Sequence, residues 1–167
     1  MKTLWTPWRM EHVLGQYPRP EGCLFEPAGD GPHDAAALLL YRDRETVVML
    51  NRFPYANGHL LVAPRRHCAE LTDLNPAESA ALMAMLQQCC AILHRCVRPH
   101  GLNLGLNLGE AAGAGVADHL HFHIIPRWQG DHNFLTPMAE LRTIPQHLEA
   151  TFARLLPEFQ ALAERRS

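Results

Sequence analysis

Three short apolar runs in the first half of the chain have the length and composition of β-strands. They cover Ala37–Arg42, Thr46–Asn51 and His59–Ala63. The polar segment Asp43–Glu45 is short enough to join the first two as a hairpin, and the Asn57-Gly58 pair is a turn signal directly before the third. The pattern therefore predicts three strands in succession, the first two of them joined by a tight turn.

A helical period replaces this pattern near residue 75. Asn75, Pro76 and Glu78 are the residue types favoured at the N-cap and at the first and third helical positions. Apolar side chains then recur every three or four residues until about Val97, which is the spacing of one helix face, and Pro99 ends the helix. The apolar positions are Leu82, Met85, Leu86, Cys89, Ile92, Leu93 and Cys96.

Two more strands and one more helix are predicted after this long helix. The strands cover Leu102–Leu108 and His119–Pro126, and the terminal helix covers residues 145–164. Residues 1–33 are rich in proline, glycine and tryptophan without a clear period, which is typical of an extended arm with turns. Strands grouped around one long helix favour the α+β fold class with an antiparallel sheet, in a single domain over residues 1–167.

Composition and charge exclude several classes of function. The chain has 15 Lys and Arg against 17 Asp and Glu, so it lacks the basic surplus that nucleic-acid binding needs. Lys2 is the only lysine, which excludes the Gly-Lys-Ser/Thr loop of phosphate-binding ATPases. The longest apolar run, Ala35–Tyr41, is far shorter than the ~20 residues of a membrane span, so no membrane partner is expected. An odd number of cysteines, 5, and the lack of a visible secretory leader predict a reducing, cytoplasmic location.

Histidine is the residue in excess, with 11 in the chain. His119, His121 and His123 alternate with apolar residues, so on a strand their imidazoles share one face. One metal ion is a poor explanation for all three, because the first and last lie ~13 Å apart on a strand, whereas zinc ligands converge on one point. A neutral imidazole, with an ordinary pKa of ~6.5, serves as nucleophile, base or orienting group, and this chemistry is what the alternation favours.

The segment His119–Ile125 resembles the signature of the histidine triad, or HIT, family, in which three histidines alternate with apolar residues. The resemblance extends to Asn51–Pro64 and Pro126–Phe134. It also extends to Leu4–Met10 and Gly113–Gly115, which are similar to a bacterial branch that includes diadenosine tetraphosphate phosphorylases. It implies an α+β half-barrel of about five antiparallel strands with one long helix and a C-terminal helix. It also implies a homodimer.

The resemblance implies an enzyme that transfers or hydrolyses nucleoside monophosphates, with dinucleoside polyphosphates or other adenylates as substrates. His121 would attack the α-phosphorus and carry the nucleotide, which water or inorganic phosphate would then release. His123 would bond the α-phosphate and His59 would contact phosphate from the opposite side. His119 would orient its neighbours or bind zinc. The catalysis itself would require no cofactor.

The family's nucleotide-binding positions also have counterparts in this chain. Asn51 would hold the ribose hydroxyls, although an asparagine at a strand end could equally cap a turn. The backbone N–H groups of a glycine-rich loop would face the phosphates, and Gly115 stands where many relatives carry a hydroxyl. Trp128 would stack on the base, or pack against a dimer partner or the arm. The implied nucleotide-binding residues are Asn51, Asn107, Gly113, Ala114, Gly115, Val116 and Trp128.

Several bacterial members of the family hold a structural zinc ion, and the resemblance implies where such a site would lie. Its ligands would be Cys23, Glu26, His67 and His119, with Glu26 in the place of a second cysteine. Because a carboxylate is also a zinc ligand, a bound zinc and a lost site both stay open.

Two functions from other classes also stay open on the sequence alone. A nucleotide-binding sensor or scaffold would keep the pocket with little turnover, and a metal-centred hydrolase would use the histidines as ligands. Activity lost in a His121→Ala variant would argue against the first, and activity lost in a chelator without unfolding would support the second.

Overall fold

The computed structural model describes residues 22–29, 31–131 and 147–166. The motif Leu4–Met10, most of the predicted arm and the first two residues of the predicted terminal helix lie outside these ranges. So does the end of the motif Pro126–Phe134.

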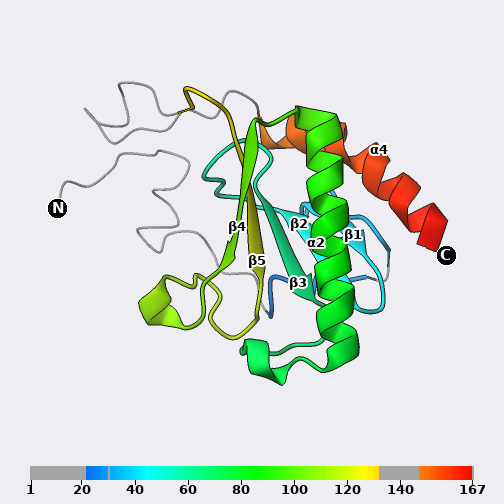
Figure 1. Cartoon of the computed structure of the whole chain (residues 1–167). Helices are drawn as coiled ribbons and strands as arrows, with labels where there is room; N and C mark the ends of the chain where they lie inside the picture. Colours follow the sequence, from blue (N-terminus) through cyan, green and yellow to red (C-terminus); the bar gives the residue numbers. More distant parts are fainter. Residues whose placement is uncertain (1–21, 30, 132–146, 167) are drawn as a thin grey trace.

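Five strands form one antiparallel sheet, which two longer helices accompany (Figure 1). The order across the sheet is β1-β2-β3-β5-β4. This confirms the predicted α+β class with five antiparallel strands, one long helix and a C-terminal helix. The elements are β1 (Leu39–Arg42), β2 (Thr46–Leu50), β3 (Leu60–Pro64), the 3-10 helix η1 (Leu71–Asp73), α2 (Pro76–Val97), β4 (Gly101–Leu106), the 3-10 helix η2 (Glu110–Ala112), β5 (Phe122–Arg127) and α4 (Leu148–Arg166).

The long helix α2 crosses one face of the sheet, and α4 packs against α2 and β1 (Figure 1). Six of the seven predicted apolar positions of α2 are buried, with Met85 and Ile92 fully inaccessible to solvent, and the seventh, Cys96, is partly buried. The helix α2 has 22 residues and contains an 18-residue stretch with a mean hydropathy of 1.3, so it is long and apolar enough to cross a membrane, a property that it shares with core helices. Here the apolar stripe is used to build the larger core of the molecule, together with Tyr41 and Phe159.

The opposite face of the sheet carries a smaller core around Phe25, whose side chain is fully buried. Phe25 lies in a turn that is closed by a hydrogen bond of 3.0 Å from the Glu26 N–H to the Cys23 carbonyl. The Arg42 guanidinium holds the chain that follows, because it donates to the Pro27 carbonyl at 2.9 Å. The segment before β1 is therefore fastened to the face that α2 leaves open. The sheet residues of this core are Leu39, Val47, Met49, Leu61 and Ala63.

The predicted strand His119–Pro126 begins later than expected, at Phe122. The first two of the three alternating histidines therefore precede the paired part of β5. The reason lies in the backbone of Leu120, whose N–H donates to the Cys68 carbonyl at 2.7 Å. That carbonyl belongs to the loop after β3, so at this point the chain has left the ladder with the neighbouring strands.

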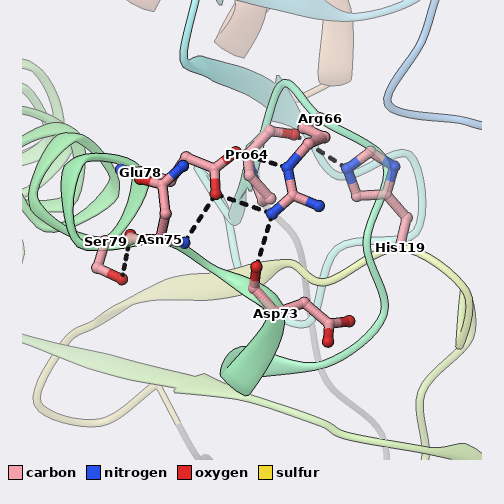
Figure 2. A network of polar contacts seen from close by, with 7 residues as sticks. All are labelled: Pro64, Arg66, Asp73, Asn75, Glu78, Ser79 and His119. Carbon is pink, nitrogen blue, oxygen red and sulfur yellow. Dashed lines mark hydrogen bonds and ion pairs between the residues drawn. The ribbon is translucent and has the colours of Figure 1, made fainter.

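A network of polar contacts fixes the loop between β3 and α2 (Figure 2). Arg66 donates to both oxygens of the Glu78 carboxylate, at 2.6 and 2.8 Å, and to the Asp73 carbonyl at 2.7 Å. Asn75 and Glu78 also cap the start of α2 reciprocally, with N–H to oxygen distances of 2.9 Å each way. The bonds from Arg66, followed by the bond from the Asn75 N–H, hold the pKa of Glu78 at about 2. The network thereby fixes the position of the next loop residue, His67.

Candidate active site

The side chains of the alternating histidines lie on the Phe25 side of the sheet in one continuous row of rings. The Phe25 ring contacts His119 and His121 at centroid distances of 5.0 and 4.9 Å. His121 contacts His123 at 5.0 Å, and His123 contacts His59 at 5.1 Å. The structure therefore brings all four predicted catalytic histidines together.

His121 has one ring nitrogen bound to the backbone and the other available for chemistry. Its Nδ1 lies 2.8 Å from the carbonyl oxygen of His119. A carbonyl oxygen only accepts hydrogen bonds, so Nδ1 carries the proton and Nε2 of the neutral ring holds a lone pair. Burial lowers the pKa of His121, which is 4% exposed, and so favours the neutral ring. This is the protonation state of a nucleophile.

A backbone donor also fixes the tautomers of His59 and His123. The Tyr55 N–H donates to His59 Nδ1 at 3.1 Å, so in the neutral ring the proton of His59 is on Nε2. His59 Nε2 lies 2.9 Å from His123 Nδ1 and donates to it. The proton of a neutral His123 is therefore on Nε2. Burial, and then the neighbouring His121, lower the pKa of His123 to about 4.

Two neighbouring rings thus carry opposite tautomers. His121 presents an unprotonated Nε2, and His123 carries a protonated Nε2. A lone pair beside an N–H donor matches a reaction in which one ring attacks a phosphorus atom and the next binds an oxygen of the same group. The arrangement is built within the protein, by the His119 carbonyl on His121 and by the Tyr55 N–H acting through His59 on His123, so it requires no substrate.

His119 belongs to a second cluster at the end of the row. Its Nε2 donates to the Pro64 carbonyl at 3.0 Å, which leaves the lone pair on Nδ1 (Figure 2). Nδ1 lies 3.0 Å from the sulfur of Cys23. The ligand atoms of Cys23, His67 and His119 all lie within 4.8 Å of one another. Three of the four predicted metal ligands are therefore gathered at one point.

The fourth predicted ligand, Glu26, lies at the edge of this cluster. Its Oε1 is 3.4 Å from His67 Nδ1, and both side chains are nearly half exposed. A thiol and two imidazoles are ligand types that zinc prefers, so Cys23, His67 and His119 fit three positions of a zinc site, with the Glu26 carboxylate beside His67 as the candidate for the fourth. Burial raises the pKa of Cys23, so without a metal the thiol keeps its proton at neutral pH.

Asn51 satisfies the turn after β2 and also touches the histidine row. Its Oδ1 accepts the Phe53 N–H at 2.9 Å, which is the turn-capping role left open by the sequence. Its Nδ2 lies 3.3 Å from His59 Nδ1 and reinforces the Tyr55 donor there. The ribose contact stays a prediction.

The glycine-rich loop before the triad is held by Asn107, whose Nδ2 donates to the Gly113 carbonyl at 3.3 Å. The N–H groups of Gly113 and Ala114 donate within the loop, at 2.9 and 3.3 Å. Across the described residues, no backbone hydrogen bond from Gly115 or Val116 is seen outside regular strands and helices. If the loop binds phosphate as predicted, the N–H groups of Gly115 and Val116 are therefore its main donors.

Trp128 lies in the turn that follows β5. Its N–H donates to the Asp131 carboxylate at 3.3 Å, and Arg127 donates to the same carboxylate at 2.6 Å. Within the described ranges, no ring contact joins Trp128 to the four histidines. The structure thus places Trp128 apart from the row, at the other end of β5, where Gly101 pairs with Arg127.

Three groups in the site have no counterpart among the predicted residues. Phe25 separates the metal cluster from His121, and the Tyr55 N–H and Pro64 carbonyl fix two tautomers. Phe25 lies between the predicted ligands Cys23 and Glu26 in the sequence, and this position could have indicated that its ring lies near the site. The two backbone groups leave no signal, because every residue other than proline has an N–H and every residue has a carbonyl.

Comparison with known proteins gives one consistent family. The HIT domain model matches residues 33–130. The AP-4-A phosphorylase of Mycobacterium tuberculosis is 39% identical over 165 residues, which span 95% of this chain and 85% of that protein. The asymmetrical bis(5'-nucleosyl)-tetraphosphatase of Schizosaccharomyces pombe is 32% identical over 93 residues, 56% of this chain and 50% of that protein. A Zn-bound histidine triad family protein from Mycobacterium smegmatis has a TM-score of 0.61 and 27% identity, over 77% of this chain and 87% of that chain.

The hydrogen bonds predict an unequal distribution of tautomers that nitrogen NMR can measure. At neutral pH, His121 should be the Nδ1–H tautomer, while His59, His119 and His123 should be Nε2–H. Long-range proton–nitrogen correlation spectra of the labelled protein distinguish the two forms, with the exposed His94 as a control outside the row. An Nε2–H tautomer at His121 would contradict the proposed geometry.

Proposed function

The chain belongs to the HIT domain family, and on this premise we propose that it cleaves dinucleoside polyphosphates or other adenylates at the α-phosphate through a nucleotide covalently bound to His121. The observation that carries the proposal is the unprotonated Nε2 of His121 next to the protonated Nε2 of His123. The names of two relatives, a phosphorylase and a tetraphosphatase of such compounds, support the substrate class.

In the first step, the Nε2 lone pair of His121 forms a bond to the α-phosphorus. The phosphorus–oxygen bond to the rest of the polyphosphate breaks, and that part leaves with the electron pair. The hydrogen bond from Nδ1 to the His119 carbonyl supports the positive charge that develops on the ring. His123 donates from Nε2 to an oxygen of the same phosphate, and His59 holds His123 in the required tautomer.

In the second step, an acceptor oxygen attacks the nucleotidyl-histidine and the nitrogen–phosphorus bond breaks, so the pair returns to Nε2. We propose inorganic phosphate as this acceptor, because the AP-4-A phosphorylase is similar over 95% of this chain. With diadenosine tetraphosphate the products are then ATP from the first step and ADP from the second. Water as acceptor would give AMP in place of ADP.

The remaining predicted residues would bind the nucleotide around this centre. Asn51 would contact the ribose while it supports His59, and Gly115 and Val116 would offer N–H groups to the phosphates. Asn107 would act indirectly, since its side chain holds the loop at Gly113. Trp128 would pack against a partner subunit more readily than on a base bound at His121.

We propose a structural zinc ion held by Cys23, His67, His119 and Glu26. The clustered ligand atoms and the Zn-bound relative support it. Four protein ligands leave no open position for water, so the ion would tie the segment before β1 to the start of the triad without taking part in the chemistry. The catalytic steps above use no metal or cofactor.

We also propose a homodimer in the cytoplasm. The strand β4 lies at the edge of the sheet, and its Leu104 is 47% exposed, so a second copy could extend the sheet there. All five cysteines, which lie within the described ranges, are free thiols, which supports a reducing compartment.

Product analysis tests the reaction. In saturating inorganic phosphate, we expect diadenosine tetraphosphate to yield ADP and ATP, and we expect His121→Ala to lose several orders of magnitude in rate while it still binds nucleotide. The His94→Ala variant, altered on the exposed side of α2, should keep full activity. AMP and ATP as products would replace phosphate by water as the acceptor. A wild-type protein that binds adenylates without turnover would instead indicate a sensor or scaffold.

Metal analysis tests the zinc site. Protein purified without an affinity tag should contain zinc, and a chelator should lower its melting temperature, because the ion binds only the folded chain. Glu26→Gln should reduce both the zinc content and the melting temperature, whereas Glu164→Gln, at an exposed position of α4, should change neither. A melting temperature that does not respond to the chelator would show that the replacement of cysteine by Glu26 marks a lost site.

A further inference from the structure

Away from the histidine row, the structure contains a second concave site that is rich in arginine. A pocket of about 510 Å³ opens where the turn between β1 and β2, the end of β3 and the end of α4 meet. Figure 1 shows the end of α4 on the β1 side of the sheet. None of the residues assigned above to catalysis, nucleotide binding or zinc lines this pocket. Its charged residues are Arg42, Arg44, Arg65, Arg166 and Asp43.

Among the described residues, the single carboxylate that lines the pocket, Asp43, makes no ion pair with Arg44 or Arg65. Asp43 uses Oδ1 to accept the Thr46 N–H at 2.7 Å. Its Oδ2 accepts from the Tyr41 hydroxyl at 3.0 Å and from Arg166 at 3.1 Å. The carboxylate is thus occupied by the turn and by Arg166, so within the described residues it leaves the positive charges of Arg44 and Arg65 unpaired.

Arg65 is the arginine with the least compensation. Its backbone N–H is fixed to the Glu45 carbonyl at 2.7 Å, which places the side chain beside the β1–β2 turn. Its Nη1 is buried without a hydrogen-bond partner among the described residues. Leaving a buried donor unpaired costs free energy, most of all on a charged group. An anion on the pocket side of the guanidinium would not reach Nη1, but it would supply a counter-charge and hydrogen-bond acceptors to the rest of the group.

The neighbouring arginines add to the positive potential. Arg42 is 9% exposed and is held in the pocket wall by bonds such as that to the Pro27 carbonyl. Arg44 is exposed, and no ion pair of Arg44 or Arg65 is found within the described ranges. Guanidinium groups are planar and form paired hydrogen bonds to phosphate oxygens, so several of them around one cavity select phosphate anions.

We propose that this pocket binds a multiply charged phosphate anion, either a free inorganic oligophosphate or the phosphate chain of a nucleotide. The volume is sufficient for several phosphate groups, since a water molecule occupies only ~30 Å³ of liquid. The site is separate from the histidine chemistry, so it is retained in His121→Ala, and that variant allows nucleotides to be tested without turnover.

The test is an NMR titration of labelled full-length His121→Ala with inorganic tripolyphosphate. The amide signals of Asp43–Thr46 and Arg65 should shift with a saturable dependence on concentration. The Arg44→Gln/Arg65→Gln pair should weaken this binding by at least about tenfold, the size expected for the loss of charged hydrogen bonds. Arg154→Gln, which removes an exposed arginine of α4 outside the pocket, should leave the affinity unchanged.

Two further measurements identify the ligand and separate a loss of binding from a loss of folding. ATP that binds tenfold more tightly than tripolyphosphate at these amides supports the nucleotide source, and equal affinity supports the phosphate chain alone. Arg65→Lys keeps the positive charge but lacks the paired N–H groups of the guanidinium. Its affinity for tripolyphosphate should lie between those of the wild-type side chain and Arg65→Gln, both in the His121→Ala background. The proposal is overturned if sulfate at matched ionic strength gives the same shifts, if the paired substitution leaves them unchanged, or if only residues 119–123 respond.

Discussion

The hydrogen bond between His121 Nδ1 and the carbonyl of His119 decides which nitrogen of the proposed nucleophile is free. This carbonyl is available because the backbone has already left the strand ladder, with the Leu120 N–H bonded to Cys68 instead. A regular strand from His119 onward would commit its backbone groups to neighbouring strands. The late start of β5 is therefore a condition of the chemistry, and Phe25 packs against both rings to hold them in place.

The segment from His119 to His123 serves both the proposed zinc site and the proposed catalysis, and each uses a different ring nitrogen. His119 points its protonated Nε2 at the Pro64 carbonyl and its lone pair at Cys23, while His121 and His123 point toward the proposed reaction centre. A zinc ion at His119 would thus fix the backbone that orients His121, and it would leave the lone pair of His121 free. The Arg66–Glu78 network supports this from the other side, because it sets the loop that carries His67 (Figure 2).

Local periodicity was sufficient for the α+β fold class and for the three alternating histidines, whereas His59 was predicted only through the family resemblance. The alternation at His119, His121 and His123 requires only a locally extended chain, and the cap at Asn75 requires only neighbouring residues. The start of β5 was misplaced because the partner of Leu120 is Cys68, some fifty residues away, and no periodicity encodes that contact. The tautomers of His59 and His119 were equally out of reach, since they depend on backbone groups at Tyr55 and Pro64. That of His121 depends on the nearby His119 carbonyl, but the bond forms only where the chain has left the ladder.

The central claim is that His121 carries the nucleotide, and trapping that intermediate tests it most directly. The wild-type protein would be mixed with diadenosine tetraphosphate in phosphate-free buffer, where the proposed acceptor is missing, and quenched in alkali, in which nitrogen–phosphorus bonds of this kind survive. Mass spectrometry of the peptides would then locate the adenylyl group. We expect the group on His121, and its release as ADP when phosphate is added before the quench. Release of ATP with the adenylyl group on another residue, or turnover with no labelled peptide in the first cycle, would contradict it.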